Sequence, residues 1–309
     1  MKQAVSISIG SSVRNKETTV QILGEEVNIK RIGTDGDMQK AAQLYRELDG
    51  KVDAFGVGGT DLGLYIDGKW YELHSVKSLV KDVQTTPVVD GLGLKTTLEI
   101  NAAQHLEKEI PEYLAKVGRK VLVMTALDRF GLAKSFIDGG FDYTFGDLLY
   151  SLGVNVPLHT IQSIKTLAAI LLPVFSRVPF EWLYPTGESQ NERKPKFVEQ
   201  FHKAAIVAGD CHYITRYMPD EMPGKVIVTN TTTPEDVALF TKAGVKYLMT
   251  TTPVLDGRSF GTNMMEAAIV AAAGRTQKVD YRHAEEHFAF LADVVEKMGM
   301  KPQIRELNK

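Results

Sequence analysis

The sequence predicts an α/β fold, and two observations lead to that prediction. Short apolar runs rich in Val and Ile recur along the chain, and most are followed by a segment with helical periodicity. The runs are apolar throughout rather than alternating, which is typical of parallel strands covered by helices on both faces. The repeated order of strand and helix therefore favours the α/β class. The eight strand candidates are Val5–Ile9, Asp53–Val57, Pro87–Val89, Val121–Met124, Asp142–Phe145, Ala205–Val207, Val226–Val228 and Tyr247–Met249.

Helices and hairpins are expected between these strands. Two segments with alternating runs on either side of a glycine predict β-hairpins, Thr18–Ile32 and Tyr65–Leu73. The second contains Asp67-Gly68, a strong signal for a type I′ turn. A long helix is expected over Leu94–Val117, interrupted at Pro111 because proline cannot donate a helical hydrogen bond. The other expected helices are Met38–Leu48, Gly131–Asp138, Pro234–Ala243, Gly261–Ala273 and Tyr281–Met298.

The long helix marks the expected domain boundary, near Gly118. Residues 1–118 would form an N-terminal α/β substrate domain with the two hairpins, and 119–280 a Rossmann-like cofactor domain with a doubly wound parallel sheet. Residues 281–309 would form a C-terminal helix that packs back. The alternative is a single (β/α)8 barrel whose last two strands form a phosphate site. The hairpins and the long gap between Asp147 and Ala205 count against the barrel.

Composition excludes several classes of protein. The 309 residues include 36 basic and 38 acidic side chains, a balance that gives no footprint for nucleic acid. No apolar stretch is long enough to span a membrane. The single cysteine, Cys211, excludes an intramolecular disulfide and a cysteine-based zinc site, and no metal site is expected. We therefore expect a cytoplasmic protein that acts on a small molecule.

Residues Lys120–Asp147 have the layout of a dinucleotide-binding unit: strand, turn, helix, second strand and a final acidic residue. In such units the amides at the helix start bind a pyrophosphate, and the acidic residue about 20 positions later accepts hydrogen bonds from a ribose. Asp147 follows Asp128 by 19 positions, which fits this spacing. Its carboxylate would favour NAD over NADP because it would repel a 2′-phosphate.

The glycine fingerprint of such units is incomplete. Its three slots fall on Ala126, Asp128 and Gly131, so that only the third is glycine. A structural strand–helix–strand unit without a ligand is therefore the alternative. The tips of the later strands add polar residues at the carboxyl edge of the sheet, where ligands of open α/β sheets bind. The cofactor-binding candidates are Thr125, Asp128, Arg129, Gly131, Asp147, Asn230 and Thr231.

Three residues in the N-terminal third are the catalytic candidates. Asp61 follows the second expected strand, and Asp90 and Lys95 follow the third, so all three are expected at one edge of a sheet. A lysine beside a carboxylate can transfer a proton to or from a hydroxyl group, as alcohol oxidation requires. The alternatives are helix capping for the carboxylates and a solvated helix start for Lys95.

Six stretches spread along most of the chain carry a family resemblance: GTDGDM (33–38), AFGVGGTDL (54–62), DRFGLA (128–133), FGDLLYSLG (145–153), PFEWLYPTGE (179–188) and DGRSFGTN (256–263). These stretches resemble bacterial quinate 5-dehydrogenases. The resemblance implies a substrate domain followed by a dinucleotide domain, and a lysine–aspartate pair acting on a ring hydroxyl. The N-V-T-x-P-x-K and N-T-D signatures of the related shikimate and quinate dehydrogenases are absent, so no catalytic residue transfers by motif.

The leading hypothesis is an NAD(P)-dependent oxidoreductase acting on a small polar hydroxy acid similar to quinate or shikimate. The rival is a non-catalytic metabolite-binding or sensor protein on a Rossmann-like fold, suggested by the missing glycines and missing catalytic signatures. The apolar stretch Ser163–Leu183 is expected either in the core or in the contact of a homodimer.

Overall fold

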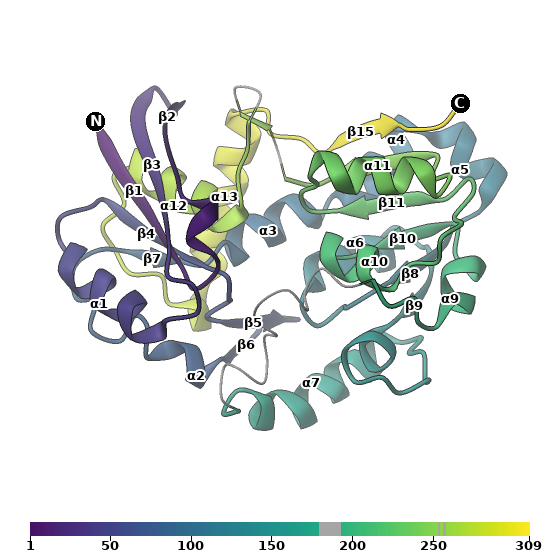
Figure 1. Cartoon of the computed structure of the whole chain (residues 1–309), viewed down its shortest axis with the longest axis horizontal. Helices are drawn as coiled ribbons and strands as arrows, with labels where there is room; N and C mark the ends of the chain where they lie inside the picture. The colour runs from purple at the N-terminus through teal and green to yellow at the C-terminus, as the bar shows by residue number, and fades with distance from the viewer. Residues whose placement is uncertain (179–192, 253, 256–257) are drawn as a thin grey trace. The chain divides into compact units, whose positions relative to one another are not determined.

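The computed structural model describes residues 1–178, 193–252, 254–255 and 258–309 (Figure 1). Contacts divide these residues into two compact units. The first unit holds the described residues of 1–97, 169–186 and 254–300, and the second holds those of 98–168, 187–253 and 301–309. This division differs from the expected boundaries at 118 and 280. The chain enters the second unit at residue 98 rather than 118, and it returns to the first unit twice, from residue 169 and again from residue 254.

The first unit is built on a five-stranded sheet in the order β2-β3-β1-β4-β7. All neighbouring strands are parallel except β2 and β3, which form the first expected hairpin around Leu23 and Gly24, both with positive φ. The second expected hairpin, β5–β6, turns at Asp67 and Gly68. Both hairpin predictions are confirmed. The strand bounds are β1 Lys2–Ser8, β2 Lys16–Ile22, β3 Glu25–Gly33, β4 Ala54–Gly58, β5 Gly63–Ile66, β6 Lys69–Glu72 and β7 Val88–Val89.

Helices cover both faces of this sheet. Alternate residues of β1, Val5 and Ile7, pack with Tyr45 of α1, whose hydroxyl donates to the Ile7 carbonyl at 3.1 Å. The intervening residue Ser6 faces α12 and accepts a 2.7 Å hydrogen bond from the Asn263 amide. The period-2 alternation of a strand thus gives each face its own helix. The helical segments of this unit are η1 Ser12–Arg14, α1 Met38–Leu48, α2 His74–Lys77, α12 Thr262–Ala272, η4 Tyr281–His283 and α13 Glu285–Lys297, with a short hairpin β13 Val254–Leu255 and β14 Arg258–Ser259.

Glycines allow the close approach of α12 to the sheet. A Cβ atom at Gly56 would lie 2.7 Å from the Asn263 carbonyl oxygen. A Cβ atom at Gly58 would lie 2.8 Å from the Ser8 Cβ atom of β1 and 3.1 Å from the Asn263 side-chain amide nitrogen of α12. The distances of 2.7 Å and 2.8 Å are shorter than Cβ atoms tolerate, so glycine in the AFGVGG stretch serves packing at these two positions.

The second unit is built on a six-stranded sheet in the order β15-β12-β11-β10-β8-β9. All neighbouring strands are parallel except β12 and β15. The order reverses beside β8, because β9 lies on one side of it and β10, β11 and β12 follow on the other. Ligands of open parallel sheets bind at such a reversal, outside the carboxyl ends of the strands. The strand bounds are β8 Lys120–Val123, β9 Asp142–Phe145, β10 Ile206–Ala208, β11 Val226–Thr229, β12 Tyr247–Thr250 and β15 Gln303–Glu306.

One apolar core of this unit joins Leu122, Val207 and Ile227 of the sheet to Ile214 of α10 and Phe240 of α11. The start of α11 is fixed by a capping box between Thr233 and Asp236, at the position where the expected helix Pro234–Ala243 begins. The helices that lie in this unit, or partly in it, are α3 Leu92–Glu99, α4 Ala102–Glu109, α5 Pro111–Val117, α6 Phe130–Asp138, the π-helix η2 Asp147–Ser151, α7 Ile161–Phe175, α9 Val198–Lys203, α10 Cys211–Tyr217 and α11 Pro234–Lys242.

The α/β class is confirmed, and three expectations need correction. The strands lie in two separate open sheets, so the single closed barrel is wrong. The expected helix over 94–117 breaks not only at Pro111 but also between α3 and α4. The strand β15 was not predicted, because its segment KPQIRELNK carries more charge than a buried strand and occupies a sheet edge. Part of the apolar stretch 163–183, from 179 onward, lies outside the described residues.

Among the helices of the described residues, none combines the length and apolar character needed to cross a bilayer.

Replacing Gly56 by alanine tests the packing of α12 on the sheet. The added Cβ meets a backbone oxygen that cannot move aside, so we expect Gly56→Ala to lower the free energy of unfolding by about 1–3 kcal/mol. Gly10→Ala is the matched control, because its closest neighbours are side-chain atoms at 3.3 Å. Urea unfolding followed by circular dichroism measures both variants. Equal stability of Gly56→Ala and wild type would contradict this packing.

Candidate functional site

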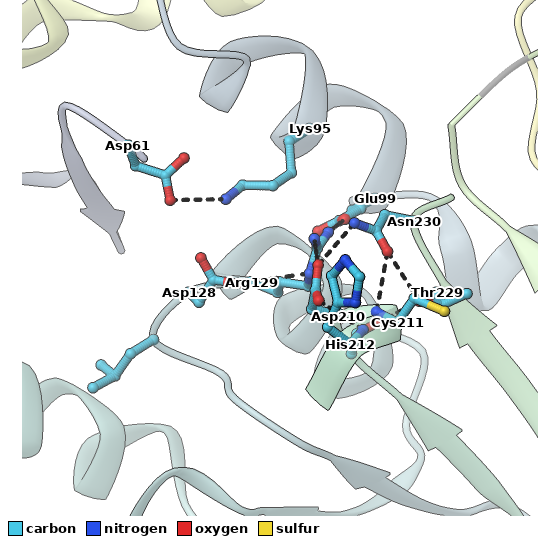
Figure 2. Close-up of polar contacts among 12 residues, drawn as sticks. Asp61, Lys95, Glu99, Asp128, Arg129, Asp210, Cys211, His212, Thr229 and Asn230 are labelled. Atoms are coloured by element: carbon cyan, nitrogen blue, oxygen red, sulfur yellow. Dashed lines mark hydrogen bonds and ion pairs between the residues drawn. The ribbon is translucent and has the colours of Figure 1, made fainter. Parts of the chain in front are cut away.

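The first candidate site is an ion pair in the first unit, between Lys95 of α3 and Asp61 after β4. The Lys95 Nζ atom lies 3.8 Å from Asp61 Oδ2, and Figure 2 shows the two side chains pointing toward each other. The Lys95 side chain is 8% exposed and that of Asp61 is 23% exposed. A cation is thus held in a poorly solvated place beside a carboxylate that is partly exposed to solvent. Such a pair can move a proton at a hydroxyl group.

Asp90 accepts hydrogen bonds from backbone amides close to both members of this pair. One of its oxygens accepts from the Leu62 amide at 2.8 Å, directly after Asp61. The other accepts from the Leu92 amide at 3.0 Å, where α3 begins one turn before Lys95. The Tyr281 hydroxyl donates to this second oxygen, also at 3.0 Å. Asp90, expected as a catalytic residue, is therefore buried and serves to position Asp61 and Lys95.

A second buried carboxylate, Glu266 of α12, supports the same helix. It accepts a 2.8 Å hydrogen bond from the Leu94 amide, and its other oxygen lies 2.8 Å from His287 Nε2. Burial raises the pKa of Asp90, and the nearby Glu266 charge raises it further; the Leu62 and Leu92 amides and the Lys95 charge oppose the shift. Glu266 was not predicted as a site residue, although it is the only charged residue in the helix TNMMEAAIVAA.

The second candidate site is the turn after β8 in the second unit, where the sheet order reverses. Asp147 is 2% exposed and directs both oxygens into this turn. They accept from the amides of Ala126 at 3.0 Å and Leu127 at 2.9 Å. Burial raises the pKa of Asp147 to about 6, although the two amides act against the shift. The expected contact with a ribose is therefore not the one that this carboxylate makes.

Arg129 lies at the centre of a buried polar network beside the turn. It forms ion pairs with Glu99 of α3 and, at 2.9 Å, with Asp210 at the tip of β10 (Figure 2). The Asn230 amide, from the tip of β11, donates to the same Asp210 oxygen at 2.8 Å. Burial alone would raise the pKa of Asp210, but the Arg129 charge holds it below its usual value. The network ties the tips of three neighbouring strands together.

These contacts decide how well the turn fits a nicotinamide dinucleotide. A pyrophosphate at the start of a helix is bound by free backbone amides, and a nearby positive charge that is not already balanced would strengthen its binding. Asp147 holds two of the amides, and the positive charge of Arg129 is balanced by Glu99 and Asp210. The Asp128 carboxylate, 38% exposed, stands at the middle glycine slot. The turn as it stands does not fit the pyrophosphate of a dinucleotide.

The remaining candidates have mainly structural surroundings. Thr125 is buried, and its hydroxyl has no hydrogen-bond partner within the described part of the chain. Gly131 is buried in the first turn of α6, and Thr231 is half-buried between β11 and α11. Burial raises the pKa of the Cys211 thiol, as expected for a small core residue rather than a nucleophile.

Two partners of the network were missed by sequence analysis. Glu99 lies four residues after Lys95 in an otherwise uncharged helix, LGLKTTLE, and this pairing of charges on one helix face was an unused signal. Asp210 is the second of these partners, and no role was predicted for it. Its pairing with Arg129 joins positions 81 residues apart, which no local pattern reveals.

No group of three or more His, Cys, Asp or Glu side chains that could hold a metal ion occurs among the residues that the structure describes.

Residues 93–307 match a family described as a domain of unknown function, DUF8754. The chain belongs to this family. Residues 3–90 match a second domain of unknown function, DUF8753. The border between the two matches falls at the end of β7, directly after Asp90. A search of curated proteins found no match to this chain.

Solved structures give only distant similarities. A malic enzyme of Entamoeba histolytica is 13% identical with a TM-score of 0.38; the match covers 100% of this chain and 66% of the enzyme, so the chain spans about two thirds of its length. A periplasmic sugar-binding protein of an ABC transporter from Legionella pneumophila is 10% identical with a TM-score of 0.36, covering 91% of this chain and 99% of that one. At these TM-scores the similarities carry no argument.

The raised pKa of Asp147 predicts a pH-dependent contribution to stability. The folded state ionises Asp147 with a pKa of about 6, against 3.8 as its ordinary value, so stability falls as the pH rises between these values. Relative to Asp147→Asn, which does not titrate, wild type should lose about 2–3 kcal/mol between pH 4 and pH 7. Urea unfolding of both proteins across this range measures the difference. A difference that stays constant with pH would show that the pKa is not raised.

Proposed function

We propose that this chain is an enzyme that acts on a small polar hydroxy acid, with Lys95 and Asp61 as its proton-transfer pair. The observation that carries the proposal is their 3.8 Å contact at the carboxyl edge of a parallel sheet. Two further buried carboxylates, Asp90 and Glu266, are hydrogen-bonded to the backbone around the pair. Such support for two charged side chains is typical of a site in which geometry matters.

The proton transfer takes place at a substrate hydroxyl placed against the pair. Lys95 acts as the base in its neutral amine form, reached when its ammonium group releases a proton to solvent: the amine then accepts the hydroxyl proton, and the Asp61 carboxylate stabilises the ammonium group that forms again. In the reverse direction Lys95 returns the proton to the oxygen. Low exposure of Lys95 strengthens both interactions, since little water screens them.

Oxidation of that hydroxyl is the most specific form of the proposal. It is supported by the resemblance to quinate 5-dehydrogenases, in which a lysine–aspartate pair acts on a ring hydroxyl. The resemblance also implies NAD or NADP as the hydride acceptor. Because the turn after β8 does not fit a pyrophosphate, we derive no step through that cofactor.

The second candidate function is binding of a metabolite without catalysis. One observation favours it: Asp147 holds the amides that a dinucleotide would need. In this reading the Lys95–Asp61 pair is a recognition site for a hydroxylated ligand, and the chain is a sensor or carrier.

A turnover assay with Lys95 variants tests the enzyme proposal. Proton NMR follows quinate, shikimate and malate with wild-type protein, alone and with NAD⁺ or NADP⁺. We expect Lys95→Met and Asp61→Asn to lower turnover by about 10²–10⁴-fold, the usual contribution of acid–base catalysis. Lys81→Met, at an exposed lysine of the same unit, is the control and should retain full turnover.

Each outcome of this assay decides between the alternatives. Turnover that needs NAD⁺ or NADP⁺ and requires Lys95 would establish a dehydrogenase. Unchanged turnover in Lys95→Met would refute the proton-transfer role of the Lys95–Asp61 pair. Binding of an acid without any turnover would favour the metabolite-binding function.

A further inference from the structure

We propose that His287 of α13 is a positioning residue for Lys95, and that it acts through Glu266 of α12. This inference rests on the proposed function of the Lys95–Asp61 pair. It names the side chain that keeps Lys95 in place for proton transfer, a residue to which neither the motifs nor the comparisons assign a role. All of these residues lie in the first unit.

Two hydrogen bonds connect His287 to the backbone of α3. The His287 Nε2 atom lies 2.8 Å from Glu266 Oε1, and Glu266 Oε2 accepts a 2.8 Å hydrogen bond from the Leu94 amide. Lys95 is the next residue, and its own amide donates to the Gly91 carbonyl at 2.8 Å to close the first turn of the helix. A carboxylate that is hydrogen-bonded at both oxygens does not rotate freely. His287 thus helps to fix the Leu94 amide, directly before Lys95.

Gly93 lets the backbone of α3 lie directly on this pair. A Cβ atom at Gly93 would lie 3.0 Å from Glu266 Oε1, 3.1 Å from His287 Cδ2 and 2.6 Å from Leu291 Cδ1. Glycine inside a helix costs about 1 kcal/mol relative to alanine. The helix therefore carries this residue, two positions before Lys95, where any other side chain would push the backbone away from His287 and Glu266.

The imidazole of His287 is itself held by aromatic neighbours. The residue is 5% exposed. Its ring meets that of Tyr281 at 89° with 6.4 Å between centroids, and that of Phe290 lies 6.2 Å away. The Tyr281 hydroxyl donates to Asp90 Oδ1 at 3.0 Å. The ring that contacts Glu266 is thus fixed by the same tyrosine that is hydrogen-bonded to Asp90.

Packing alone does not account for this pair. Glu266 is 0% exposed and is the only charged residue of α12. Burying polar groups costs free energy that apolar side chains of similar size would avoid. What apolar side chains could not supply is an acceptor for the Leu94 amide, one of those that the first turn of a helix leaves without an intrahelical partner. The pair therefore serves the start of α3, where Lys95 lies.

Turnover by variants of the full chain is the first test, with whichever of quinate, shikimate and malate the wild type converts. We expect His287→Leu, which cannot form a hydrogen bond with Glu266, to lower kcat about 10–100-fold and to leave KM within about twofold, because a misplaced proton-transfer group slows the chemical step. His287→Gln carries an amide near the place of Nε2 and should restore kcat. His283→Leu, at a histidine whose side chain is 83% exposed in the same unit, is the matched control.

NMR is the second test, and it does not depend on turnover. Protein labelled with ¹³C at lysine Cε gives a signal for Lys95, which is assigned by its loss in Lys95→Met. Exchange with deuterium reports on the Leu94 amide. We expect His287→Leu to shift the Lys95 signal and to speed Leu94 exchange at least about tenfold, since a hydrogen bond to a charged group is weakened. His287→Gln and His283→Leu should leave both signals as in wild type.

The outcomes separate this inference from the proposed function. Unchanged Lys95 and Leu94 signals in His287→Leu, a changed KM with full kcat, or no rescue by His287→Gln would overturn the positioning role of His287. If wild type converts none of the acids, the enzyme proposal fails, and the two NMR signals alone decide on His287. Should His287→Leu fail to fold, His287→Asn replaces it: this variant carries its amide at the place of Nδ1 rather than Nε2, so wild-type signals in it would overturn the inference.

Discussion

Backbone amides left over at the carboxyl ends of parallel strands are the constraint on which both units of this protein depend. These N–H groups lie close to buried surface, and an unpaired one costs about as much as a lost hydrogen bond. In this chain buried carboxylates accept them. Asp90 takes two such amides in the first unit, and Asp147 takes two in the second.

The same solution has opposite consequences in the two units. In the first unit Asp90 fixes the loop after β4 and the start of α3, so that Asp61 and Lys95 meet at a partly exposed edge. In the second unit Asp147 accepts hydrogen bonds from the backbone amides that would bind an anion, and the charge of Arg129 is balanced by Glu99 and Asp210. Asp61 of the first unit thus stays partly exposed beside Lys95. In the turn after β8 of the second unit, by contrast, the backbone amides are hydrogen-bonded to the Asp147 side chain.

The sequence predicts those parts of this arrangement that depend on local patterns. Asp67-Gly68 gives the turn of a hairpin, and Thr233 with Asp236 gives a helix start, because both signals act over a few residues. The role of Asp147 was not predictable in this way. Its spacing from the turn fits a ribose-binding residue equally well, and only the direction of the side chain tells the two apart. The pairing of Arg129 with Asp210 spans two strands of the sheet and leaves no local trace.

The claim that Asp147 occupies the turn can be tested at the two amides themselves. Titrating isotope-labelled protein with NADH and with NADPH at neutral pH, and following the amide signals of Ala126 and Leu127 by NMR, gives a direct answer. We expect no saturable shift of either signal at millimolar cofactor, because both N–H groups are hydrogen-bonded to Asp147. A saturable shift of these two signals would contradict it and would return the turn to the role of a nucleotide site.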